Sequence, residues 1–119
     1  LLSEFGDISN LIMIEPVGYL DFVALVSESK IVITDSGGIQ EETTALGIPC
    51  ITMRENTERP ITVSQGTNKV VGTNPNSIVS EVMASLEESG ENPPIPEYWD
   101  GKTAKRIVDV LESRIRERE

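Results

Sequence analysis

The sequence predicts an α/β fold in which a parallel sheet is flanked by helices. Three short runs, 11–14, 31–34 and 49–53, are rich in β-branched and other apolar residues and lack the polar alternation of a half-exposed strand. Segments with helical spacing of apolar residues, near 19–28 and 38–46, separate these runs. Strands and helices that alternate in this way are typical of βαβ units, which place parallel strands side by side.

A fourth strand and a third helix follow in the same pattern. Residues 69–71 are a short apolar run ended by a glycine, and apolar residues recur every fourth position over 75–88. Either Asn74 or Asn76 can act as the N-cap of this helix, with Pro75 near its first position. The chain therefore contains three to four strands, which is few for an independent sheet of this type and predicts a fragment of a larger fold.

The end of the chain is predicted to be a separate helix. Residues 102–119 carry six basic and four acidic side chains, whereas 1–101 carry four and sixteen. A proline-rich stretch at 92–96 connects the two parts. We therefore expect a partial domain at 1–100 and a C-terminal helix within 101–119.

Length and charge exclude several classes of protein. The 119 residues are about one ordinary domain, and their apolar content is sufficient for a buried core. A net charge of −10 argues against nucleic-acid binding, which requires a basic face. The apolar runs are far shorter than a membrane span of about 20 residues. Because Leu1 is followed by neither a basic region nor a cleavage site, we expect a cytoplasmic protein.

The residue types also limit the chemistry. The chain has no histidine, the commonest general base, and a single cysteine, Cys50, which cannot form an internal disulfide. A zinc site is excluded because a single cysteine without histidines cannot supply its ligands, so no metal is expected. We expect Cys50 to be a buried strand residue, and Tyr98 and Trp99 to pack against the final helix.

The segment 34–42 is the strongest candidate for a binding site. A predicted strand ends at Thr34, and Ser36, Gly37 and Gly38 precede a helix. Ligands of open α/β sheets bind at the carboxyl ends of strands, and the unpaired N–H groups of a helix N-terminus attract phosphate. The glycines would allow close approach of the backbone, and the serine hydroxyl could donate to the same group. A Gly-Gly turn with Ser36 or Asp35 as N-cap is an equally valid interpretation of these residues.

Two acids follow in the first turns of this helix. Glu42 would have to point past a phosphate, and a ribose diol suits it because one carboxylate can accept from both hydroxyls. Glu41 is expected to be solvated. The alternative is that both acids only stabilise the helix dipole.

A cation and an aromatic residue complete the candidate site. Arg59 follows the strand at 49–53, and its guanidinium can bind phosphate in a bidentate fork. The alternative is an ion pair between Arg59 and Glu58 or Glu55. Phe22 lies near the start of the first helix and could stack on a nucleobase, although a place in the core is its ordinary role.

Four segments in this order resemble the non-hydrolysing UDP-N-acetylglucosamine 2-epimerases. They are DSGGIQEE at 35–42, ALGIPC at 45–50, TERP at 57–60 and GTNKVVG at 66–72. The resemblance is to the C-terminal part of that family and extends over nearly the whole chain. It implies a Rossmann-like, nucleotide-binding lobe that forms the C-terminal half of a two-domain fold of the glycosyltransferase-B type.

The resemblance also implies a role for each candidate residue. Ser36, Gly37 and Gly38 would hold the diphosphate of UDP, Glu42 the ribose, Arg59 the phosphate region and Phe22 the uracil side. The helix within 101–119 would cross to the missing N-terminal lobe.

The family reaction interconverts UDP-N-acetylglucosamine and UDP-N-acetylmannosamine by elimination and re-addition of UDP, and it serves cell-surface polysaccharide biosynthesis. It uses no nicotinamide, so no cofactor is expected. The family's catalytic groups lie mainly in the other lobe or before residue 1, so no catalytic residue is assigned and the isolated chain should be inactive. Many relatives have an acid after TERP where this chain has Ile61, which leaves the exact sugar open.

Two other functions fit the same residues. A UDP-sugar glycosyltransferase lobe would keep the fold and use an acceptor in place of re-addition. A non-catalytic acidic interaction domain would not bind UDP. In the epimerase fragment, where the other lobe is missing, the apolar stripe of the last helix should pack back on the domain or pair with a second copy in a homodimer.

Overall fold

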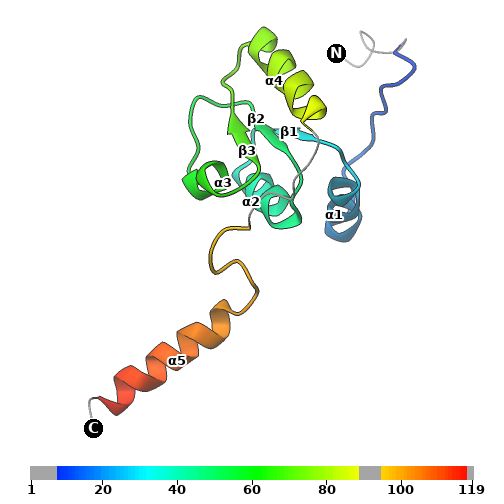
Figure 1. Ribbon diagram of the computed structural model, residues 1–119. Coiled ribbons are helices and arrows are strands. Elements are labelled where there is room, and N and C mark those ends of the chain that lie inside the picture. The colour runs from blue at the N-terminus through cyan, green and yellow to red at the C-terminus, as the bar shows by residue number, and fades with distance from the viewer. Residues whose placement is uncertain (1–7, 89–94, 118–119) are drawn as a thin grey trace.

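The computed structural model describes residues 8–88 and 95–117. Helices and strands alternate over most of this length, as Figure 1 shows. In chain order the elements are α1 (Tyr19–Ser27), β1 (Val32–Thr34), α2 (Gly37–Leu46), β2 (Cys50–Thr52), α3 (Pro60–Ser64), β3 (Asn68–Val70), α4 (Pro75–Glu87) and α5 (Thr103–Arg116).

The three strands form a parallel sheet in the order β1-β2-β3. Ile33 is paired with Ile51, and Ile51 with Lys69, so the strands are in register along their whole length. Helix α2 packs against all three strands, α1 packs against α2, and α4 contacts β2 from the opposite face (Figure 1). The predicted α/β fold with a parallel sheet and flanking helices is confirmed.

Most predicted elements are present, and one strand is not. The strands expected at 31–34 and 49–53 are β1 and β2, and the one expected at 69–71 begins one residue earlier, as β3. The prediction of a strand at 11–14 is wrong, because these residues form no ladder and Ile12 is 85% exposed. A strand needs a neighbour to satisfy its main-chain groups, and the described residues provide none for this segment.

The start of α4 was predicted correctly. The Oδ1 of Asn74 accepts from the main-chain N of Asn76 at 2.9 Å and from that of Ser77 at 3.3 Å, and Pro75 occupies the first turn. Asn74, and not Asn76, is therefore the N-cap. The five-residue helix α3, which begins at Pro60, was not predicted.

The core of the described residues is small and largely polar. The buried hydrophobic residues are Val26, Cys50 and Ile51, so a core is present, as the composition allows, but it is small. Three large apolar side chains of α4 and one of β1 remain exposed: Val79 at 62%, Met83, Leu86 and Ile33. Apart from Pro96, the remaining buried residues are polar: Thr34, Gln40, Thr43, Thr44, Thr52, Thr62, Asn68 and Ser85.

Helix α5 stands apart from the sheet (Figure 1). None of its residues is buried, and Ile107, Leu111 and Ile115 are 54%, 57% and 61% exposed. The expectation that this helix packs back on the domain is wrong, whereas pairing with a second copy stays a prediction. Tyr98 does contact the helix, since the Arg106 guanidinium lies 4.9 Å from the centre of its ring.

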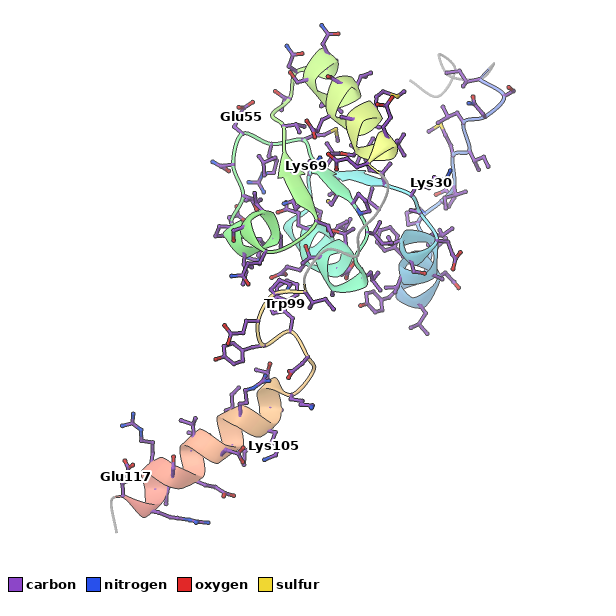
Figure 2. The ribbon with its side chains drawn as sticks, viewed as in Figure 1. Lys30, Glu55, Lys69, Trp99, Lys105 and Glu117 are labelled. Atoms are coloured by element: carbon purple, nitrogen blue, oxygen red, sulfur yellow. The ribbon has the colours of Figure 1, made fainter. Side chains whose placement is uncertain are left out.

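The connection to α5 contains a glycine in a turn conformation. Gly101 has φ +75°, a conformation that favours glycine, and Figure 2 shows Trp99 in the segment between the sheet and the helix. Part of the proline-rich stretch lies outside the described residues, as does the start of the chain. Among the helices in 8–88 and 95–117, none has the length and apolar character needed to cross a membrane.

Candidate functional site

Two loops meet at the carboxyl ends of β1 and β2. The first leads from β1 into α2, and the second leads from β2 to Arg59 at the start of α3. A Cβ added to Gly37 would lie 4.0 Å from Oε2 of Glu58, which places the second loop beside the first turn of α2. The sequence prediction that these two segments meet is consistent with this arrangement.

The N-terminus of α2 has free donors. Ser36 is the N-cap residue, but its side chain makes no capping hydrogen bond. The first main-chain bond of the helix runs from the N of Gln40 to the O of Ser36, at 3.4 Å. Within the described part of the chain, the amides of Gly37, Gly38 and Ile39 have no acceptor. Ser36 therefore occupies the N-cap position that the alternative interpretation gave it, but its side chain forms no capping bond, and three N–H groups remain available.

The two glycines are not required by the fold. Neither has a positive φ, in contrast to Gly72 at +74°. A Cβ on Gly37 or Gly38 would meet its nearest neighbour at 4.0 or 3.9 Å, which is ordinary contact, whereas a Cβ on Gly66 would lie 2.5 Å from the O of Thr62. The chain itself thus needs glycine at 66 and 72 but not at 37 or 38.

Arg59 is held against α2 by an acid. Its Nε lies 3.0 Å from Oε1 of Glu41, within ion-pairing distance but without the alignment of a hydrogen bond. The Nε atom is buried while the side chain as a whole is 43% exposed, so the exposed surface belongs to the rest of the side chain. Glu41 is therefore paired and not simply solvated, as had been expected. Of the two alternative partners, Glu58 pairs with Arg54 at 3.2 Å instead, and within the described residues Glu55 forms no ion pair with Arg59.

The other two candidate residues lie on the same helices as predicted, without contacts that define a role. Glu42 is half-buried on α2, and Phe22 is half-buried on α1, which packs against α2. Their assignment to ribose and uracil stays a prediction.

The site contains binding groups but no evident catalytic group. Burial raises the pKa of the Cys50 thiol, against the opposing effect of side-chain hydrogen bonds with Thr43 and Thr52, so the thiol stays protonated at neutral pH. No group of three or more metal-ligating side chains occurs in 8–88 or 95–117. The whole chain lacks histidine. The arrangement can bind an anion but supplies no obvious general base.

Sequence reasoning missed a buried polar network beneath the site. Gln40 is fully buried, and its Oε1 accepts from the Thr57 hydroxyl at 2.6 Å and from Nδ2 of Asn68 at 3.1 Å. All three residues lie within the motifs quoted above. A buried glutamine side chain without hydrogen-bond partners would be costly, and Thr57 and Asn68 supply partners for its oxygen. The signal that could have identified them is the glutamine on the inner face of a helix that packs against the sheet.

Comparison with known proteins identifies the family. The family model described as UDP-N-acetylglucosamine 2-epimerase matches residues 1–112. The chain belongs to this family. The UDP-N-acetylglucosamine 2-epimerase of Methanocaldococcus jannaschii is 45% identical over 101 residues, which are 83% of this chain and 26% of that protein. The Salmonella typhimurium enzyme is 42% identical over 116 residues, which are 91% of this chain and 30% of that protein.

Solved structures of epimerases match the fold as well. The M. jannaschii UDP-GlcNAc 2-epimerase in complex with UDP-GlcNAc and UDP matches with a TM-score of 0.75 and 39% identity, covering 94% of this chain and 30% of that one. S. aureus MnaA, in a co-structure with UDP, matches with a TM-score of 0.71 and 33% identity, covering 87% of this chain and 30% of that one. The chain therefore corresponds to about 30% of the length of these epimerases and is a fragment by comparison with them.

Proposed function

We propose that this chain is the UDP-binding part of a UDP-N-acetylglucosamine 2-epimerase. The observation that carries the proposal is the start of α2, where three amides are free and two glycines are present that the fold does not require. Glycine weakens a helix by about 0.5–1 kcal/mol relative to alanine. Two adjacent glycines at a strand's carboxyl end are therefore best explained by a ligand that must approach the backbone closely.

The diphosphate of UDP fits this place by charge and shape. The free amides of Gly37 and Gly38 donate to its oxygens, with the Ser36 hydroxyl beside them. Arg59 supplies the positive charge that an acidic chain needs to bind an anion. Glu42 binds the ribose diol and Phe22 lies on the uracil side. The relatives whose structures contain UDP or UDP-GlcNAc support this choice of ligand.

The chain is proposed to be the C-terminal lobe of a two-lobed fold of the glycosyltransferase-B type. In a doubly wound sheet of order 3-2-1-4-5-6, three strands in simple succession occupy one half, and the preceding strand lies at the far edge. The order β1-β2-β3 agrees with this arrangement. The exposed apolar face of α5 would then be covered by the N-terminal lobe, which also supplies the catalytic groups. The fragment alone does not epimerise UDP-GlcNAc, and a cytoplasmic location stays a prediction.

The proposal is tested by titrating the ¹⁵N-labelled chain with UDP up to millimolar concentration and following its amide spectrum. We expect the amides of residues 36–38 to shift. Arg59→Ala removes a charge-assisted contact with phosphate, and Glu42→Ala removes the ribose acceptor, so each should weaken binding by roughly tenfold.

The matched control for Arg59→Ala is Arg114→Ala, which makes the same change in net charge on exposed α5. It should leave the titration unchanged apart from a small general effect of charge. A spectrum that does not respond to millimolar UDP, from a chain with the dispersed amides of a folded sheet, would contradict the proposed function.

A further inference from the structure

We propose that Thr57 is a positioning residue for Arg59, and that the buried Gln40 is its anchor on α2. This inference rests on the proposed function and adds two residues to the UDP site. Neither would touch the nucleotide. Their role would be to fix the loop that carries the guanidinium relative to the free amides of α2.

The Thr57 hydroxyl connects the two elements directly. It donates to Oε1 of Gln40 at 2.6 Å, and it accepts from the main-chain N–H of Arg59 at 2.9 Å. Gln40 lies in the first turns of α2, three residues after Gly37, and is fully buried. One hydroxyl thus links the backbone of the arginine to the helix whose N-terminus forms the other half of the site.

A second connection holds the other side of the same residue. The Thr62 hydroxyl donates to the main-chain O of Arg59 at 2.7 Å. Nδ2 of Asn68, on β3, donates both to Thr62 Oγ1 at 3.0 Å and to Gln40 Oε1 at 3.1 Å. Both main-chain polar groups of Arg59 are therefore bound by threonine hydroxyls, and both hydroxyls connect to the Gln40–Asn68 pair.

A buried glutamine at position 40 is not the residue that would stabilise the fold best. Within the described residues the Nε2 of Gln40 is buried without an acceptor, and an apolar side chain of similar volume would avoid that unsatisfied donor. What an apolar residue cannot provide is the oxygen that accepts from Thr57. The presence of glutamine at position 40 is thus explained by its bond to Thr57 in the loop that carries Arg59.

Fixing this loop should strengthen binding of a phosphate without adding a contact. Arginine has a long, flexible side chain, and ordering its backbone before the ligand arrives reduces the entropy lost on binding. The Glu41 ion pair orients the side chain of Arg59, and the threonine hydroxyls orient its backbone.

The experiment measures the UDP dissociation constant of the 119-residue chain by NMR titration, counting only the folded fraction as judged from dispersed amides. Thr57→Val keeps the shape and removes the hydroxyl, and we expect UDP affinity to fall about 3- to 10-fold. Thr57→Ser restores the hydroxyl, and affinity should return to within about twofold of the original.

The matched control is Thr43→Val. Thr43 is a buried threonine of the same helix whose hydroxyl donates to the carbonyls of Ile39 and Gln40 and also bonds with the Cys50 thiol. This variant should lower the urea midpoint without changing UDP affinity, which separates positioning from general stability.

If Thr57→Val binds UDP as tightly as the original chain, or if Thr57→Ser fails to restore affinity, the inference is overturned while the UDP site stands. If the original chain does not bind UDP at all, the proposed function fails, and the inference fails with it.

Discussion

The Nε of Arg59 lies 3.0 Å from Oε1 of Glu41, so the cation expected to bind phosphate is already beside an acid of its own chain. Both side chains are 43% exposed, and an ion pair in such a position is worth about 0–1 kcal/mol. A diphosphate, with more charge and a bidentate geometry, can compete with this pair. The contact therefore orients the guanidinium without blocking it.

A second acid should oppose UDP binding. Oε2 of Glu58 lies 4.0 Å from the place where Gly37 would carry a Cβ, beside the first turn of α2 where the diphosphate is proposed to bind. We predict that Glu58→Gln tightens UDP binding by about 2- to 5-fold, because it removes repulsion between two screened negative charges. Isothermal titration at low salt measures this change.

The control for this prediction is Glu55→Gln in the same loop (Figure 2). The Glu55 carboxylate lies beside Gly72, with Oε1 2.9 Å from the place of a Cβ there, and not beside Gly37. The two variants have equal net charge. An equal gain in both would indicate a general charge effect, and weaker binding by Glu58→Gln would contradict the placement of the diphosphate.

The ion pair between Lys69 on β3 and Glu81 on α4 should lose its contribution to the free energy of unfolding at alkaline pH. The Nζ of Lys69, a residue labelled in Figure 2, lies 2.9 Å from Oε1 of Glu81 and 3.2 Å from Oε1 of Glu88. The hydrogen bond to Glu81 raises the pKa of Lys69 against the opposing effect of burial, and the hydrogen bond to Glu88 and the charges of both carboxylates add to the rise. Because the folded pKa is raised, this stabilisation is fully present below the unfolded value of about 10.4 and is lost as pH rises through the folded value.

We therefore predict that Lys69→Met lowers the free energy of unfolding at pH 7 by less than about 1 kcal/mol, since Lys69 is partly exposed. The difference between the two chains should shrink above about pH 10.4. Urea unfolding of both chains at each pH measures it. The Cys50 thiol, whose pKa is raised by burial, also lowers stability at alkaline pH, but it does so equally in both chains. A difference that grows with pH would contradict the assignment.

Helix α5 should contribute nothing to the stability of the sheet. No residue of α5 is buried, and the helix makes no extended contact with any other element in the described residues. We predict that a chain ending at residue 102 keeps the urea midpoint and the sheet amide shifts of the full chain. A lower midpoint would show that α5 packs on the domain in solution.

The sequence was most informative about local structure. Asn74 and Pro75 predicted the start of α4 correctly because capping depends only on neighbouring residues. The run at 11–14 was wrongly predicted as a strand, because a strand also depends on a partner that local pattern cannot provide.

For the site, the sequence predicted which segments meet but not how they are connected. Arg59 and Gly37 were expected near one another from the geometry of parallel strands. The Glu41 partner of Arg59 and the network through Gln40 depend on side-chain contacts between residues far apart in the chain. Spacing along a sequence does not specify such contacts.

The central claim is that a diphosphate approaches the backbone at the start of α2, and alanine substitution of its glycines tests this claim most directly. Gly37→Ala and Gly38→Ala should leave the free energy of unfolding unchanged or raise it by up to about 1 kcal/mol, because alanine favours a helix. Gly66→Ala, where a Cβ would lie 2.5 Å from the O of Thr62, should lower it instead. The decisive measurement is the UDP affinity of the stable Gly37→Ala and Gly38→Ala chains. We predict a loss of about tenfold or more in at least one of them, and affinity equal to that of the original chain in both would contradict the account.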